Sequence, residues 1–378
     1  MKFFQNAAII AAITLSCAAP AVANDAVFGG AGSDLVPIKQ KNLKMVSEDI
    51  VIEEVGKKNG WKYDHWEITA TYTFENPTDK SITTQFGFPE RMCDPESDCN
   101  SKKGSQYTFY NMKTTVGGKP VKVKVGEVSS ESSWAPELGR VHLFDVTIPA
   151  KKKTTVVHKY QMGLSGSFMQ ETELLYVTKT GALWNGPIGS ARFTIRTKKR
   201  PWGFGFPKTY NLESFTTKRE GKKARTEIVF AMKDWTPTQD LTVVLGADYM
   251  PFKSCPSPLM FVDVVYDYEG KLDIERAKKE LAELSDAQLR QCRNLVYARH
   301  GYTFRDKKLG EFFYEHSEPK ASKETKWGYN QVLYPPEDYK VVIYKQNPSY
   351  TPDMLDERDT KWVKAFKAVE KSRKARKK

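Results

Sequence analysis

The residues best suited to acid–base or nucleophilic chemistry are few in this sequence. Five histidines occur among 378 residues, and neither the HExxH pattern of zinc peptidases nor the GxSxG pattern of serine hydrolases is present. One SxxK match runs from Ser317 to Lys320, but no partner motif accompanies it. We therefore predict no catalytic residue and no cofactor.

His300 is the histidine with the best-defined surroundings, because a helix is expected to end there. Its charge and its N–H donors suit the unpaired carbonyl groups and the negative dipole of a helix C-terminus. A general base would need a nearby nucleophile or carboxylate, and the sequence points to none. We prefer a structural role for His300, and also for Arg299 as a packed or ion-paired helix residue.

Cysteine spacing predicts disulfides rather than a metal site. Cys17 lies in a segment expected to be removed, and the even number that remains favours pairing in an oxidising compartment. Cys93 and Cys99 enclose a short polar loop, so we expect them to pair, and Cys255–Cys292 follows by elimination from three open pairings. Acidic residues between Cys93 and Cys99 alternate as in a calcium loop, but the glycine and distal glutamate are missing, so we predict no metal.

The N-terminus is predicted to be a Sec-type signal peptide. Lys2 precedes an apolar stretch, and a small-x-small pattern ending at Ala23 predicts cleavage before Asn24. The stretch is shorter than the ~20 residues of a membrane span. Lipidation would use Cys17, but Thr14 stands where that signal needs leucine. We expect a periplasmic or extracellular protein with no transmembrane helix in the mature chain.

Residues 200–207 have the most unusual local composition. Trp202, Phe204 and Phe206 are separated by glycines, so in an extended strand the three rings would project from one side. Such a platform could stack on sugar rings or enter a lipid surface. The preferred interpretation is that the rings cover a sheet, since aromatic side chains usually lie in cores.

The chain is basic, with a formal net charge of +13. Six cations and no acid occupy its last eight residues: Lys371, Arg373, Lys374, Arg376, Lys377 and Lys378. We expect a solvated, disordered tail, and as an alternative a contact with an anionic envelope polymer or lipid head groups. Another envelope protein is a further candidate partner. Export argues against nucleic acid as the counter-charge, and we predict none.

The elements before residue 255 are predicted to be strands. Apolar and polar residues alternate from Trp66 to Glu75, which sends one set to a core and the other to solvent. The same period recurs at residues 121–125, 191–195, 228–232 and 241–245. Many short one-faced strands predict an antiparallel β-sandwich, with a division near residues 163–167 that would give two subdomains. No βαβ alternation of a nucleotide-binding sheet is visible.

From about Lys271 the period becomes helical. A first helix is expected near residues 273–284, and Ser285 with Gln288 has the spacing of a capping box for a second. Gly301 should end that helix in the left-handed conformation. The remaining expected helical positions are Leu289, Cys292, Leu295 and Val296, then Leu309, Phe312 and Phe313 after a capping Asp306, and last Trp362, Phe366 and Val369.

Strings in the β-rich part resemble an uncharacterised bacterial secreted family that is known only as a domain of unknown function. They are Gly29-Gly30-Ala31-Gly32 with Leu35, Phe74-Glu75-Asn76-Pro77-Thr78-Asp79, Phe86-Gly87-Phe88-Pro89, and Thr180-Gly181-Ala182-Leu183-Trp184-Asn185-Gly186-Pro187-Ile188. The resemblance covers most of residues 24–250. It implies an exported β-rich domain and carries over no catalytic residue.

A second resemblance lies in the helical part. Tyr297-Ala298-Arg299-His300-Gly301 is similar to the signature of the YARHG domain, a small extracellular bacterial module. The similarity extends over about residues 284–369 and implies a fold more firmly than a role. Residues 317–346 form a longer stretch than the family pattern implies, so we expect an insertion there.

Together these features predict a multidomain chain, β then α. The expected parts are a signal peptide at 1–23, a β-rich domain at 24–255, a linker and helix at 256–283, and a helical YARHG domain with a basic tail at 284–378. The predicted function is a non-catalytic binding or interaction module of the cell envelope. The alternative is a hydrolase of envelope polymers whose site is assembled from residues distant in sequence.

Overall fold

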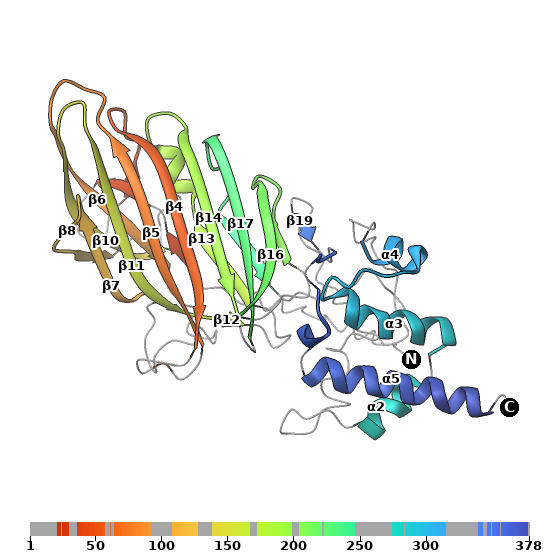
Figure 1. The fold of residues 1–378 in the computed structure, drawn as a ribbon. Coiled ribbons are helices and arrows are strands. Elements are labelled where there is room, and N and C mark those ends of the chain that lie inside the picture. Colours follow the sequence, from red (N-terminus) through yellow and green to blue (C-terminus); the bar gives the residue numbers. More distant parts are fainter. Residues whose placement is uncertain are drawn as a thin grey trace, which may run out of the picture.

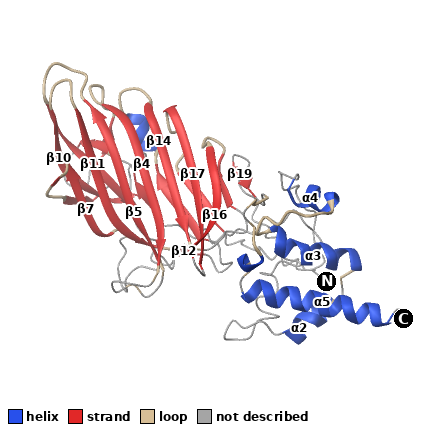
Figure 2. Cartoon of the chain, in the orientation of Figure 1, coloured by secondary structure: helices blue, strands red, loops and turns tan. Residues whose placement is uncertain are grey.

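A computed structural model places strands in the chain up to residue 245 and helices mainly after it, so the predicted order is confirmed. Figures 1 and 2 show the two groups apart from each other. The structure describes residues 21–23, 25–29, 36–56, 61, 64–91, 108–127, 138–166, 172–198, 204–220, 223–245, 274–282, 284–314, 339–342, 346–348, 350–355 and 357–376.

The largest sheet has eight strands in the order β16-β17-β14-β4-β5-β11-β7-β8. Their bounds are β4 Lys44–Val55, β5 His65–Glu75, β7 Tyr110–Val116, β8 Lys119–Pro120, β11 Lys153–Gly163, β14 Ile188–Thr197, β16 Leu212–Glu220 and β17 Lys223–Trp235. Neighbours are antiparallel except β4 and β14, which run parallel. The alternation predicted for β5 is confirmed, since its even-numbered residues from Trp66 to Phe74 are buried.

Two smaller sheets complete the β part. One has the order β1-β13-β18-β15-β19, with β12 also paired to β13, and the other has the order β3-β2-β6-β10-β9. Bounds in the first are β1 Ala21–Ala23, β12 Ser165–Gly166, β13 Thr172–Val177, β15 Phe204–Pro207, β18 Leu241–Leu245 and β19 Tyr339–Val342. Bounds in the second are β2 Ala26–Gly29, β3 Val36–Ile38, β6 Ile82–Arg91, β9 Lys124–Glu127 and β10 Leu138–Ile148.

The three sheets share one hydrophobic core, which makes the β part a sandwich. The ring of Phe206 on β15 meets Phe230 of the large sheet with centroids 4.9 Å apart, and Phe86 on β6 meets Phe74 of the same large sheet at 4.8 Å. Strands from both sides of residues 163–167 lie in the large sheet, where β4 joins β14. The core of the described residues is therefore not divided into two subdomains at that point.

One predicted strand is wrong. Residues 121–125 alternate in sequence, but β8 ends at Pro120 and β9 begins at Lys124 in a different sheet. The cause is the turn at Gly117 and Gly118, whose φ angles of 57° and 78° close a two-residue hairpin between β7 and β8. Beyond this hairpin the chain changes sheets, so the alternation spans two separate elements.

The helical part has its own core. Its elements are α2 Ile274–Leu281, α3 Asp286–Ala298, α4 Lys307–Tyr314, the 3₁₀ turn η2 Pro352–Met354 and α5 Glu357–Arg376; a second 3₁₀ turn, η1 Lys179–Leu183, lies in the β part. The capping box is confirmed, with Ser285 Oγ accepting from Gln288 N and Gln288 Oε1 accepting from Ser285 N. The shared buried residues are Leu281, Leu289, Cys292, Leu295, Val296, Ala298, Phe313, Trp362, Val363, Ala365, Phe366 and Val369.

Gly301 ends α3 as predicted. Its φ is 78°, and its N–H donates to Ala298 O while the N–H of Tyr302 donates to Tyr297 O. These two bonds form a Schellman motif, which satisfies carbonyl groups that the end of the helix leaves unpaired. The expected cap of the next helix is also present, because Asp306 Oδ1 accepts from Lys308 N at 3.0 Å.

The prediction of a disordered basic tail is wrong as far as residue 376. Helix α5 continues to Arg376, so Lys371, Arg373 and Lys374 lie on a helix. Arg373 donates to Asp286 Oδ1 at 2.9 Å, to Ala282 O at 2.7 Å and to Leu284 O. The physical reason is that this guanidinium satisfies carbonyl groups after α2 and pairs with the acidic first turn of α3.

Strand β19 joins the two parts of the molecule. It comes from the stretch that we expect to be an insertion in the YARHG pattern, yet it pairs antiparallel with β15 in the six-stranded sheet. The register runs from Phe204 opposite Val342 to Pro207 opposite Tyr339. The C-terminal part thus contributes a strand to the β-sandwich.

Candidate functional site

A carboxylate, an imidazole and a hydroxyl form a chain inside the sandwich. His158 on β11 places Nε2 3.0 Å from Asp25 Oδ1, and its Nδ1 lies 2.9 Å from Thr114 Oγ1 on β7. This order of groups can activate a hydroxyl nucleophile. However, Asp25 and His158 are fully buried and Thr114 is 4% exposed, so no substrate reaches the hydroxyl.

The surroundings of this carboxylate–imidazole–hydroxyl chain indicate that it anchors β2 of the five-stranded sheet. Phe88 stacks on the His158 ring with centroids 4.3 Å apart, and Asp25 O accepts from Trp184 Nε1 at 3.1 Å. Burial raises the pKa of Asp25, and the charge and hydrogen bond of His158 offset only part of that rise. Asp25 thus fixes the start of β2 within the core.

Glu90 forms the second buried polar cluster. Its carboxylate is fully buried and accepts from His142 Nε2 at 2.7 Å, Arg140 Nε at 2.5 Å, and the backbone N–H groups of Thr108 and Phe109 at 2.7 Å each. Burial alone would raise the pKa of Glu90, but these donors outweigh it and hold the pKa below its ordinary value. A carboxylate that accepts this many hydrogen bonds holds the surrounding strands and loop in place and is not suited to act as a general base.

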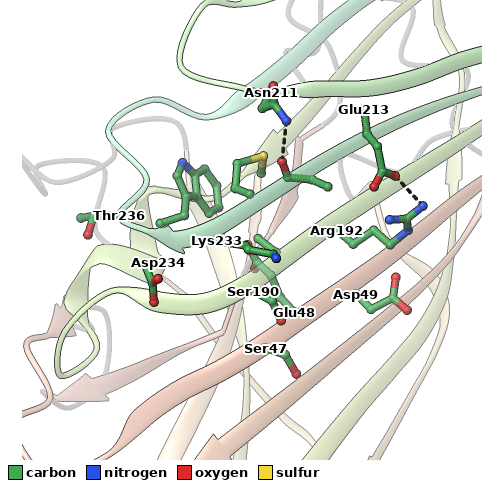
Figure 3. A pocket seen from close by; sticks show the side chains of 14 residues that line it. Ser47, Glu48, Asp49, Ser190, Arg192, Asn211, Glu213, Lys233, Asp234 and Thr236 are labelled. Carbon is green, nitrogen blue, oxygen red and sulfur yellow. Dashed lines mark hydrogen bonds and ion pairs between the residues drawn. The ribbon is translucent and has the colours of Figure 1, made fainter.

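The outer face of the eight-stranded sheet carries a depression with a volume of about 830 Å³ (Figure 3). Strands β4, β14, β16 and β17 and the segments beside them supply its walls. The lining residues are Ser47, Glu48, Asp49, Ser190, Ala191, Arg192, Asn211, Glu213, Ala231, Met232, Lys233, Asp234, Trp235 and Thr236. We name this feature the sheet pocket.

Small side chains create the hollow. Ser47 pairs with Ser190 across β4 and β14, and Ser190 pairs with Lys233 across β14 and β17. In the next row Ala231 lies opposite Arg192. Because side chains on one face of a sheet stand side by side, two serines and an alanine among longer neighbours leave unfilled space.

The strands that form the sheet pocket are irregular near it. A bulge interrupts β4 between Met45 and Ser47, and another interrupts β16 between Leu212 and Ser214. Asp234 on β17 has a φ of 46°, in the left-handed region that costs a non-glycine residue energy. Bulges re-aim side chains and collect beside functional sites.

Between these irregular strands, Gly189 of β14 makes a close approach that only glycine permits. A Cβ atom at this position would lie 2.7 Å from Val46 O, at the bulge of β4. Each of the four strands therefore has an irregular feature close to the sheet pocket: a bulge in β4 and in β16, a left-handed residue in β17, and a close-packed glycine in β14. The grouping of these features marks the pocket as the candidate functional site.

The charges of the sheet pocket are mixed. Arg192 pairs with Glu213 at 2.7 Å, and Figure 3 shows Lys233 between this pair and Asp234. Among the described residues, the side chains of Lys233, Asp49 and Asp234 have no hydrogen-bond or ion-pair partner. The pocket therefore offers both cationic and anionic groups to a polar ligand.

The proposed aromatic platform is not exposed in the described part of residues 200–207. Phe204 and Phe206 are buried in the main core, where they stack on each other with centroids 5.7 Å apart. Their rings do project to one side, but that side faces the large sheet, because Phe206 also meets Phe230. This placement favours the sheet-covering interpretation for these two residues, and Trp202 lies outside the described residues.

The YARHG signature residues lie at the junction of α3 and α5. His300 Nε2 is 2.6 Å from Asp359 Oδ2, and an Arg299 guanidinium nitrogen is 3.8 Å from Asp359 Oδ1. Tyr297 packs against Tyr302, and its partial burial raises its pKa. Ala298 is fully buried. Sequence reasoning missed Asp359 because it lies far from the signature in the chain.

The remaining predicted site residues fall into two groups. Cys292 is disulfide-bonded, whereas Cys93, Cys99 and Cys255 lie outside the described residues, so both pairings stay predictions. Lys371 and Lys374 are exposed on α5, and the structure does not describe Lys377, Lys378 or the side chain of Arg376.

Neither a metal site nor a membrane-spanning helix is found in the described ranges. No group of three or more His, Cys, Asp or Glu side chains there could hold a metal ion. No helix there combines the length and the apolar character that crossing a membrane requires.

Comparisons with solved structures give distant likenesses. A "putative nutrient binding protein" of Legionella pneumophila is 23% identical, with a TM-score of 0.48, over 91% of this chain and 99% of that one. An M1 zinc metallopeptidase of Deinococcus radiodurans is 12% identical, with a TM-score of 0.28, over 56% of this chain and 44% of that one. No curated protein matches the chain.

Two family models match the chain and confirm both resemblances. The model described as a domain of unknown function (DUF4424) matches residues 23–131 and 165–244, and the YARHG domain matches residues 266–371. The second match includes α2, whose Leu281 lies in the helical core. The chain therefore belongs to the DUF4424 family and carries a YARHG domain after it.

Proposed function

We propose that this chain is an exported cell-envelope protein that works by binding, and that the sheet pocket holds a small polar ligand. The observation that carries the proposal is the grouping of two bulges, a close-packed glycine and a left-handed aspartate around one hollow. Such irregularities lower the stability of the fold and are found next to functional sites, so their grouping here supports a binding site.

The chemistry of the lining indicates the kind of ligand. Lys233 can receive an anionic group, while Asp49 and Asp234 can receive ammonium or hydroxyl donors. Amino acids carry both kinds of group, and neutral sugars carry hydroxyl donors that Asp49 and Asp234 can receive. No observation favours the alternative of a hydrolase, since the one carboxylate–imidazole–hydroxyl chain found among the described residues is sealed in the core.

The test uses the mature protein and two matched substitutions. Ser190→Trp should fill the sheet pocket, whereas Thr115→Trp places the same ring on β7 of the same sheet, which β5 and β11 separate from the pocket strand β4. Thermal shift measurements with amino acids, monosaccharides and disaccharides should identify a ligand that raises the melting temperature of the native protein and of Thr115→Trp, but not of Ser190→Trp. A shift that persists in Ser190→Trp would place binding elsewhere, and the absence of any shift would contradict the proposal.

Export is part of the same proposal. We propose cleavage of residues 1–23, which removes β1, and a periplasmic or extracellular location. The mature chain would then have a β-rich domain at 24–255, a linker that begins at residue 256, and a YARHG domain that includes α2, since its family model matches residues 266–371. Mass mapping of the envelope protein should find Asn24 at its N-terminus. A diacylated Cys17 would contradict this assignment.

A further inference from the structure

Helix α5 presents a row of lysines to solvent. Lys364, Lys367, Lys371 and Lys374 are exposed and follow one another at intervals of three or four residues. With 3.6 residues per turn and 1.5 Å per residue, their directions fall within an arc of about 80°, and the row is about 15 Å long. We name these four residues the lysine stripe.

The opposite face of α5 fixes the direction of the stripe. Trp362, Phe366 and Val369 are buried in the helical core, between 4% and 6% exposed. Arg373 further ties the helix to the start of α3. Helix α5 therefore cannot turn its lysines inward without losing that core, and its apolar side chains are not available to enter a lipid layer.

No acid neutralises the stripe within the described part of the chain. The nearest acid on the same helix, Glu370, pairs with Arg293, and Asp286 pairs with Arg373. The four lysines have no ion-pair or hydrogen-bond partner among the described residues. Like charges at these intervals destabilise an isolated helix, so an anionic partner would relieve their repulsion.

We propose that the lysine stripe binds a linear polyanion, a chain molecule whose phosphate or carboxylate groups recur along its length. Because the four lysines lie within a narrow arc, one linear polyanion that lies along the helix can contact all of them. A flat membrane would contact the helix only along this one line of cations, so the arrangement suits it less well. Lysine acts as a mobile point charge rather than as a rigid fork, so it suits a flexible partner. This proposal is independent of the sheet pocket and replaces the disordered tail with a structured binding surface.

Two sets of four substitutions provide the test. The first changes the stripe: Lys364→Gln, Lys367→Gln, Lys371→Gln and Lys374→Gln. The second removes the same charge from exposed lysines of the β part: Lys113→Gln, Lys122→Gln, Lys124→Gln and Lys159→Gln. Glutamine keeps a helix propensity close to that of lysine, so α5 should persist, and circular dichroism and melting check this.

The probes are long-chain inorganic polyphosphate and vesicles that contain phosphatidylglycerol, each titrated with the mature protein at several salt concentrations. We expect the stripe variant to bind polyphosphate about tenfold more weakly or worse, with a shallower salt dependence, while the control set stays close to the native protein. Equal losses in both sets, or no loss in the stripe variant, would overturn the proposal. Tighter stripe-dependent binding to vesicles than to polyphosphate would also overturn it, in favour of a membrane. If the fourfold stripe variant does not fold, Lys364→Gln with Lys371→Gln is compared with Lys113→Gln with Lys159→Gln.

Discussion

The imidazole of His300 lies 2.6 Å from the carboxylate of Asp359, so the signature histidine joins the end of α3 to the first turn of α5. The sequence predicts instead that His300 serves the carbonyl groups of its own helix. Asp359 is only 7% exposed, and its carboxylate also lies 3.8 Å from the guanidinium group of Arg299. One buried carboxylate thus contacts two residues of the signature.

The first prediction concerns this contact. His300→Ala and Asp359→Ala should each lower the free energy of unfolding of the helical part by about 1–3 kcal/mol, because each leaves a buried polar group without its partner. In a double-mutant cycle the two losses should not add. Additive losses in urea melts would show that the two side chains act separately.

The second prediction concerns Gly301. Gly301→Val should cost about 1 kcal/mol or more, because a β-branched residue is strongly disfavoured at a φ of 78°. Gly310→Val is the matched control, since a Cβ atom at position 310 meets nothing within 4 Å and that glycine lies in α4. Valine is at least as good a helix former as glycine, so the control should not lose stability. Equal urea melts for native and Gly301→Val protein would contradict the left-handed cap.

The third prediction concerns pH and Asp25. Burial raises its pKa in the folded state, so the folded protein holds this proton more tightly than the unfolded chain. The contribution of Asp25 to stability is therefore complete below its unfolded pKa and declines as pH rises through its folded pKa. The decline amounts to about 1.4 kcal/mol for each tenfold difference in proton affinity between the folded and unfolded states. Asp25→Asn should remove this decline.

Urea melts of the native protein and Asp25→Asn, from just below the ordinary aspartate pKa of 3.8 up to neutrality, would measure this decline. Asp49→Asn, the same change at an exposed position of β4, is the matched control. A stability difference between native protein and Asp25→Asn that grows in favour of the native protein with rising pH would reverse the assigned sign.

The fourth prediction separates two neighbouring cations of the C-terminal segment. Arg373→Gln should destabilise the helical part by about 1.5–3 kcal/mol, since it removes charged hydrogen bonds to Asp286 and to carbonyl groups after α2. Lys374→Gln should have no measurable effect, because Lys374 is exposed and has no partner among the described residues. Deletion of residues 371–378 should therefore lower the melting temperature, which a truly disordered tail would not do.

The fifth prediction concerns the disulfides. Non-reducing peptide mapping should find Cys292 joined to Cys255 and Cys93 joined to Cys99. Replacing Cys255 and Cys292 by serine should cost about 2–4 kcal/mol. Four free thiols in the mature protein would refute both pairings.

Local patterns predicted most of the elements. The alternation in β5, the capping box of Ser285 and the end of α3 at Gly301 depend on neighbours in the chain, and each is confirmed. The prediction of a strand at residues 121–125 is wrong because the alternation of apolar and polar residues does not show where the chain passes from one sheet to another.

The candidate site is harder to predict because it depends on long-range register. Ser47, Ser190 and Ala231 read as ordinary strand residues, and only the pairing of β4, β14 and β17 brings them into one hollow. Asp359 could not be linked to His300, since nothing local relates α5 to α3. The lysine spacing in α5 was visible, but its exposed face depends on which side of the helix packs in the core.

The pairing of β15 with β19 sets an order on folding. Phe204 stands opposite Val342, so the six-stranded sheet cannot be completed until the chain is available as far as residue 342. Until then β15 presents an open edge beside β18, and open edges recruit strands from other molecules. Contacts between such distant segments also form slowly. A protein truncated after residue 255 would keep that open edge permanently, so the isolated β-rich domain should assemble into oligomers that the full chain does not form.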